Sequence, residues 1–299
     1  MDRVPYIFID AVATISNCYS LIALAAFRKR PWSRVASVHG ANRKNWRLNV
    51  IQTEQNSLLA LFSFVNEDNS VEFASLQQFQ KLDPRFNQIA ELEFDSETSV
   101  FCTWNEDPSP ELWRSMDTKS QVAVFLSRVL PRTNYANMSW FNLSISDSLN
   151  FHSSLLRHFE GRNPKTELLE LTYIGPESLT FLKQQINLQV LDELNLTGPW
   201  PQETVKLIEE VIPQRQFFQL NCSARRLMFN AQYFRWLVTS WLADANFKGT
   251  KQISVENSFL FDYKNFMCIP AGEFEWVSCD KSAKAIMTVE VGEFSVSIQ

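Results

Sequence analysis

Glycine is scarce in this sequence, with seven among 299 residues. Loops that cradle phosphate groups depend on glycine, because a backbone without Cβ can turn tightly and approach a ligand closely. The sequence contains neither GxGxxG nor GxxxxGKS/T, and it also lacks the GxSxG and HExxH motifs of hydrolases and zinc proteases. These absences exclude the nucleotide-binding and hydrolytic classes that are defined by such motifs.

Histidine and cysteine are few as well. His152 and His158 are six positions apart, which places them on different faces of one helix, and His39 is remote in sequence. We therefore predict no metal site and no cofactor. The five cysteines form no CxxC pair, which is typical of reduced, mostly buried thiols in the cytoplasm or nucleus. A Cys and His pair that is distant in sequence remains the open catalytic alternative.

Clustered positive charge is also missing. The net charge is −5, and the longest basic run is the short segment 28–30. Nucleic-acid affinity depends largely on clustered Lys and Arg, so we predict no nucleic-acid partner. Adjacent carboxylates such as Glu209 and Glu210 are typical of solvated helix charge, and we predict a protein that is not an enzyme.

No clean membrane-spanning run is present. Residues 4–27 are long enough to span a bilayer, but they include Asp10 and a polar break from Asn17 to Ser20. An aspartate near the centre of a span costs roughly 2.5 to 3.5 kcal/mol. A neutral start followed by a late basic cluster does not fit a signal peptide either. We predict no membrane association, and an anchor over residues 4–27 is the alternative.

Aromatic and aliphatic residues are abundant, with 24 Phe and 9 Trp. Near the N-terminus they recur at helical spacing, as Val4, Phe8, Val12 and Ile15 show. Pro5 is suited to the start of a helix, and Pro31 ends or kinks the helix before it. The spacing predicts three short amphipathic helices between residues 4 and 38.

This pattern, followed by "RKRPWSRV" and "HGANRKNWRLNV", resembles an F-box, the module that docks onto the Skp adaptor of cullin-based ubiquitin ligases. The chain also resembles the F-box families expanded in nematodes, with a "VP..F.D.V" opening and a later "RFNQIAELEF" segment. It departs from the common pattern where Asn17 to Ser20 replace a Leu-rich connection, which leaves adaptor binding open. The resemblance implies that the adaptor is bound by Val4, Pro5, Ile9, Val12, Leu21 and Leu24. In that arrangement Trp32 holds the helices together. The alternative is a plain helical segment that packs on its own domain.

Short β-like runs follow from Trp46 to about residue 104, and "NEDPSPE" at residues 105–111 is the predicted linker. From about residue 117, helix-like and strand-like segments alternate. Taking Leu143, Leu171, Leu196, Leu220 and Val255 as equivalent strand positions gives spacings of 28, 25, 24 and 35 residues. Leucine-rich repeats have periods of about 20 to 29 residues. We predict a solenoid of such βα units, with a compact α/β domain as the alternative.

Alternation within the strands assigns two faces. The inward side chains are predicted to be Leu169, Leu171, Leu194, Leu196, Phe218, Leu220, Ile253 and Val255. The opposite face is the predicted target-binding surface, made of Glu170, Thr172, Asn195, Thr197, Gln219, Asn221, Ser254 and Glu256. The last segment, 274–299, is predicted to form antiparallel strands that turn at Asp280 to Ser282 and cap the solenoid.

The sequence thus predicts an α/β (α+β) fold with three domains: an F-box-like helical module over 1–44, a linking β region over 45–110, and a leucine-rich-repeat-like βα domain over 111–299 that ends in an antiparallel hairpin. The predicted function is that of a substrate-recognition adaptor of a cullin ligase, with a Skp-type adaptor and an unidentified protein substrate as partners. The alternative is a protein-binding repeat protein without a ligase.

Overall fold

The computed structural model describes most of the chain in detail up to residue 223. The described residues are 4–16, 18–27, 30–66, 68–96, 108–136, 138–223, 227, 233, 236, 251–256, 272–277, 284–290 and 293–298. The protein is mixed α/β, as predicted, and it divides into two compact units, Met1–Thr166 and Glu167–Gln299. The domain boundaries at 44/45 and 110/111 stay predictions.

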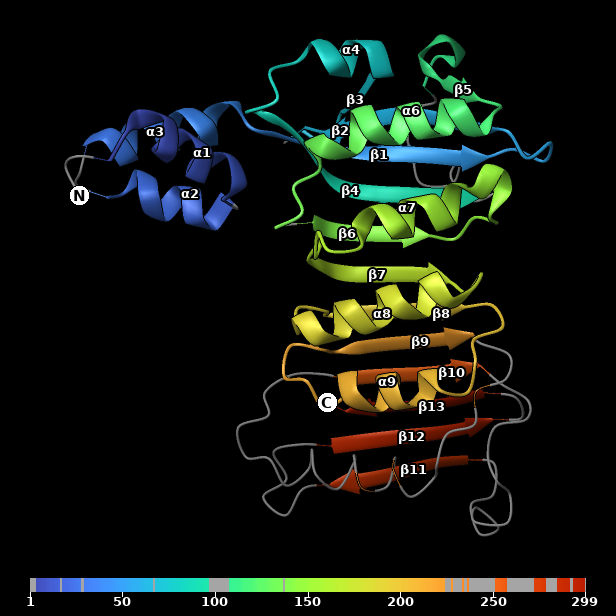
Figure 1. Cartoon of the computed structure of the whole chain (residues 1–299). Helices are drawn as coiled ribbons and strands as arrows, with labels where there is room; N and C mark the ends of the chain where they lie inside the picture. The colour runs from blue at the N-terminus through green and yellow to red at the C-terminus, as the bar shows by residue number, and fades with distance from the viewer. Residues whose placement is uncertain are drawn as a thin grey trace. The chain divides into compact units, whose positions relative to one another are not determined.

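The first unit begins with three short helices (Figure 1), α1 (Tyr6–Ile15), α2 (Cys18–Ala25) and α3 (Arg30–Asn42). Pro5 is the N-cap of α1, and Pro31 lies in the first turn of α3, where its missing N–H removes no helical hydrogen bond. The three predicted helices are therefore confirmed. No helix within the described ranges has the length and apolar character that a bilayer crossing requires.

The strands of the first unit form an open sheet. In chain order they are β1 (Lys44–Gln52), β2 (Leu58–Val65), β3 (Val71–Ala74), β4 (Asn87–Ser96), β5 (Arg114–Met116) and β6 (Met138–Leu143). Their spatial order is β6-β4-β1-β2-β3, and β5 pairs with β2. The pairs β1–β4 and β4–β6 are parallel, whereas β2 runs antiparallel to β1, β3 and β5. The predicted strand run "VFCTW" lies outside the described residues.

Helices cover one face of this sheet. They are α4 (Leu76–Lys81), α6 (Lys119–Val129) and α7 (Phe151–Phe159), with the 3-10 turns η1 (Pro110–Leu112), η2 (Leu130–Arg132) and η3 (Ser148–Asn150) between them. Capping boxes begin α4 at Ser75 and α6 at Thr118. Aromatic rings join helices to strands: Phe79 of α4 stacks on Phe62 at 4.0 Å, and Phe151 of α7 lies 5.2 Å from Phe94. Aromatic rings therefore join the helices to the sheet within a core that also contains many aliphatic side chains.

The second unit alternates helices and strands in the order that the repeat pattern predicts. Its elements are β7 (Thr166–Thr172), α8 (Pro176–Leu188), β8 (Glu193–Thr197), α9 (Thr204–Val211), β9 (Gln219–Ser223), β10 (Lys251–Glu256), β11 (Gly272–Val277), β12 (Lys284–Glu290) and β13 (Glu293–Ile298). The strands β7, β8, β9 and β10 are parallel neighbours, and β13, β12 and β11 continue the sheet antiparallel. The predicted turn at residues 280–282 and most of the predicted helix over 224–245 lie outside the described residues.

The inward face of the parallel strands is largely as predicted. Buried inward side chains are Leu169, Leu171, Leu194, Leu196, Leu220 and Ile253. The prediction for Phe218 is wrong: it precedes β9 and is 44% exposed, while its neighbour Phe217 is buried instead. The side chain of Val255 lies outside the description.

One predicted strand equivalence is also wrong. Register pairs Leu171 with Leu196 and Leu196 with Cys222, whereas Leu220 pairs with Leu194. The error is two residues. Because side chains alternate with a period of two, this shift leaves Leu220 on the inward face.

Candidate protein-binding sites

The three N-terminal helices pack around a small apolar core of their own. Its buried members are Ile9, Ala13, Leu21, Val35 and Ala36, with Val4, Leu24, Ala25 and Trp32 packed against them. The indole ring of Trp32 in α3 also makes an edge contact with Phe8 in α1, at a centroid distance of 6.5 Å. Trp32 thus holds the helices together, as predicted.

This core contains part of the predicted adaptor-binding set, which stays a prediction. Ile9 and Leu21 are each only 2% exposed, so their side chains face the other helices and do not form a surface. Val4, Val12 and Leu24 are half-buried. Of the six predicted residues, Pro5 alone is exposed. On α1 the side chains that leave water are Ile9 and Ala13, whereas the periodic positions Phe8 and Ile15 are 53% and 60% exposed.

Other large apolar side chains of these helices and of the turn after α2 face solvent. They are Tyr6, Ile7, Phe8, Ile15, Tyr19, Ile22, Phe27 and Val38, which we call the exposed apolar surface. Ile7 is 78% exposed and Tyr19 is 79% exposed. Exposed apolar groups concentrated on one small element are typical of a protein-binding surface. The predicted adaptor-binding set contains none of them, because helical spacing does not show which apolar side chains of three short helices pack against one another and which face solvent. Apolar residues left over after the stripe is assigned to a core are the signal that could have found them.

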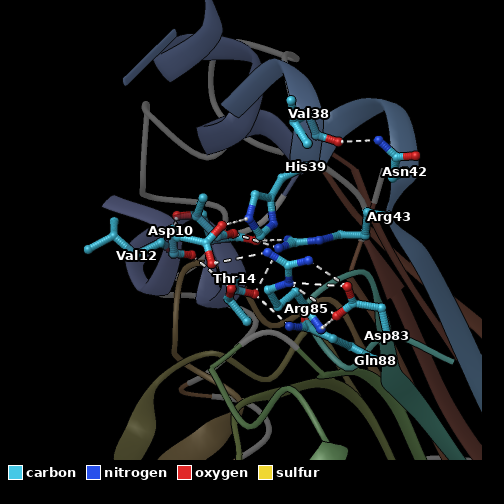
Figure 2. A network of polar contacts seen from close by, with 12 residues as sticks. Asp10, Val12, Thr14, Val38, His39, Asn42, Arg43, Asp83, Arg85 and Gln88 are labelled. Carbon is cyan, nitrogen blue, oxygen red and sulfur yellow. Dashed lines mark hydrogen bonds and ion pairs between the residues drawn. The ribbon is translucent and has the colours of Figure 1, made fainter. Parts of the chain in front are cut away.

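A polar network fixes the C-terminal end of α1 (Figure 2). Arg43, one residue beyond α3, donates to the main-chain oxygens of Ala13 at 2.5 Å and Thr14 at 2.8 Å, and also to that of Ser16. The last carbonyls of a helix have no partner within the helix and carry partial negative charge. A guanidinium group with several donors in one plane satisfies several of them together.

A second contact joins α1 to α3. His39 Nε2 lies 2.8 Å from Asp10 Oδ1, and the imidazole is fully buried, with its ring 5.0 Å from that of Phe86. Asp10 also lies 4.0 Å from the guanidinium group of Arg85. The aspartate that disfavours membrane insertion is therefore a structural partner of histidine in this helical module.

The network continues to β4 and the loop before it. Gln88 Nε2 donates to the Thr14 main-chain oxygen at 2.7 Å, and Asn134 Nδ2 donates to Gln88 Oε1 at 3.0 Å. Arg85 also pairs with Asp83 at 2.7 Å, which lowers the pKa of that carboxyl and raises the pKa of the guanidinium. Side chains of the sheet thus hold the end of α1.

Most side chains on the outward face of β7, β8, β9 and β10 are polar, and we call this face the polar lattice. One row runs by register through Glu170, Asn195, Asn221 and Ser254. Within it, Asn221 Nδ2 donates to Asn195 Oδ1 at 2.7 Å. In the next row the hydroxyls of Thr172 and Thr197 are 2.7 Å apart.

The predicted target-binding residues are thus brought together by the register. Seven of the eight have described side chains on this outward face, and the side chain of Glu256 lies outside the description. Among the described side chains at outward positions of these four strands, none is Lys or Arg, while Glu170 and Glu193 carry negative charge. The face is polar and acidic.

The histidines do not converge. His152 is buried, with Nδ1 3.1 Å from the Ile145 main-chain oxygen, and burial lowers its pKa to about 4. His158 Nε2 lies 3.0 Å from the Tyr135 hydroxyl. Within the described part of the chain, no group of three or more His, Cys, Asp or Glu side chains could hold a metal ion.

No family model, curated protein or solved structure matches this chain. The F-box resemblance therefore enters below as a proposal.

Proposed function

We propose that this protein is a substrate-recognition adaptor of a cullin-type ubiquitin ligase. The observation that carries the proposal is the exposed apolar surface on three short helices at the start of the chain. In this proposal the helices dock onto a Skp-type adaptor, and the outward strand face of the second unit receives a target protein. The compartment that suits such a protein is the cytoplasm or nucleus.

Because Ile9 and Leu21 are buried between the helices, we propose that other side chains contact the adaptor. Tyr6 and Ile7 on α1, together with Tyr19 and Ile22 on α2, are free to enter apolar recesses of the adaptor, because they take no part in the helices' own core. Tyr and Ile bury large areas at interfaces, and an aromatic ring retains a polar tip that can form a hydrogen bond. The N-terminal network would present these side chains on a fixed support.

The proposed target-binding surface is the polar lattice on the outward face of β7 to β10. We propose that β7 to β10 with α8 and α9 are leucine-rich-repeat-like units, whose outward strand positions meet the target. Amide and hydroxyl groups in rows donate and accept hydrogen bonds along an extended segment. Because Glu193 lies on this face and none of the described outward side chains is Lys or Arg, the face favours a target segment with basic side chains.

The test is a binding measurement between the purified full chain and a purified Skp-type adaptor by biolayer interferometry. Ile7→Asp/Ile22→Asp should weaken binding at least about tenfold, since a charge would be buried in an apolar contact. Val65→Asp is the matched control, because Val65 is also an exposed apolar side chain but lies at the end of β2. Its affinity should stay within about twofold of the unmodified chain.

Absence of any adaptor binding by the unmodified chain would leave the second candidate, a repeat protein that binds its partner without a ligase. The departure from the F-box pattern at Asn17 to Ser20 favours that candidate. Equal losses in the control and in the test variant would show that the helices are not the docking site.

A further inference from the structure

A groove in the first unit, remote in sequence from both surfaces above, has the chemistry of a peptide-binding site. It encloses about 450 Å³ between α4, the segment from η1 to β5, and α6. This volume lies within the range of about 300 to 1,000 Å³ that ligand pockets span. Four residues of α6 that line it are spaced as one face of the helix: Gln121, Val124, Phe125 and Arg128.

The bottom of the groove is apolar. Met116 and Phe125 are almost fully buried beneath it, and Trp113 and Leu76 are half-buried at its sides. Val124 also lines the groove and is 48% exposed, so an apolar side chain is held open to solvent there. An apolar side chain of a ligand would shield Val124 from water, which is favourable.

Two arginines line the same groove. Arg114 and Arg128 are both exposed, and within the described residues neither guanidinium group forms a hydrogen bond or ion pair. Among the described residues that line this groove, Glu111 is the only acidic one. An unpaired guanidinium group prefers a carboxylate, which it can bind through two parallel hydrogen bonds.

Glutamine amides supply the remaining polar groups. Gln77 and Gln80 of α4 are exposed and line the groove, and their side chains form no hydrogen bond with the described part of the chain. Each amide can donate and accept. This matches the main chain of an extended peptide, which offers an N–H and a C=O at each residue.

We propose that this groove binds a short acidic segment of a partner protein, in which Asp or Glu alternates with large apolar residues. The apolar side chains lie over Val124 and Phe125, the carboxylates pair with Arg114 and Arg128, and Gln77 and Gln80 bind the main chain. The site shares no residue with the proposed adaptor-binding and target-binding surfaces. A test of this groove is therefore independent of the proposed ligase function.

The test uses the full chain and a fluorescein-labelled peptide in which Asp and Glu alternate with Leu and Phe, followed by fluorescence anisotropy. Saturable binding is expected. Replacing the acidic residues of the peptide by Lys, or its Leu and Phe by Ser, should abolish binding, because the groove needs both features. Arg114→Glu/Arg128→Glu should weaken binding at least about tenfold, because charge-assisted hydrogen bonds are replaced by repulsion.

Val124→Asp gives an independent loss of similar size, since it removes the apolar contact and leaves both arginines in place. The matched control is Lys183→Glu/Lys206→Glu, which changes the net charge equally at exposed positions of α8 and α9 and should keep affinity within about twofold. Circular dichroism verifies that each variant is folded. No saturable binding by the unmodified chain, an undiminished affinity of the Arg114→Glu/Arg128→Glu variant, or an equal loss in the control would overturn the proposal.

Discussion

Asp10 Oδ1 lies 2.8 Å from Nε2 of the fully buried His39, and this contact joins the first helix to the third. Without Asp10 this ring nitrogen would remain buried away from water and would have lost its hydrogen-bond partner, which destabilises the folded state. Asp10→Ala is therefore expected to lower the free energy of unfolding by about 1 to 3 kcal/mol. Urea denaturation followed by tryptophan fluorescence measures the change.

Asp83→Asn is the control for that variant. Asp83 forms its ion pair with Arg85, which is 53% exposed, so water and salt screen the interaction. The urea midpoint should change little. If both variants shift the midpoint equally, the contact between Asp10 and His39 does not stabilise the helices.

Arg43→Gln should loosen the C-terminal end of α1. The guanidinium group donates to three main-chain oxygens at that end, and a glutamine side chain is shorter and offers only two N–H donors on one nitrogen. Faster amide hydrogen exchange is expected in α1 and unchanged exchange in α7. Unaltered exchange in α1 would show that the helix ends without help from Arg43.

Acid should weaken the fold through His152. Burial lowers its folded pKa to about 4, whereas in the unfolded chain it is near its ordinary value of 6.5. The unfolded state therefore binds the proton more readily, so stability is lost as the pH falls from about 6.5 to about 4. The full difference corresponds to roughly 3 kcal/mol. Urea unfolding of the unmodified chain and of His152→Gln at pH 7 and pH 5 separates this contribution. The variant should lose less stability between the two pH values, and an equal loss would contradict the assignment.

Neighbouring positions on β8 should respond differently to truncation. Leu196 is fully buried, and Leu196→Ala leaves a cavity that typically costs about 2 to 5 kcal/mol. Asn195 is half-buried and hydrogen-bonds to Glu193 and Asn221, so Asn195→Ala should cost about 1 kcal/mol. Thermal melts compare the two variants. Equal losses would mean that the assignment of inward and outward faces on β8 is wrong.

Local sequence patterns predicted many of the described helices and strands, because helices and strands depend on residues that are close in sequence. The apolar run over residues 58–65 is β2, and alternation assigned Leu194 and Leu196 to the core. Phe218 was misassigned because a strand's first residue is not fixed by alternation alone. The two-residue error at Leu220 arose because spacing between repeats does not determine strand register.

The candidate sites were harder to predict from the sequence than the helices and strands. Periodicity identifies which side of a helix is apolar, but it does not distinguish burial against a sister helix from exposure to a partner, as Ile9 and Ile7 illustrate. The cap that Arg43 forms and the groove beside Val124 depend on segments far apart in the chain. No spacing rule brings such residues together before the fold is known.

The link between Gln88 and the Thr14 carbonyl spans 74 residues of sequence. On the ribosome the three helices α1 to α3 leave the exit tunnel before the strand that carries Gln88. Until β4 has been synthesised, the end of α1 lacks this support, while the apolar side chains of the helices are already in contact with solvent. A nascent chain of this protein therefore passes through a stage in which the exposed apolar surface is present but the contact from Gln88 is not. A chaperone that binds apolar segments would protect the chain during this interval.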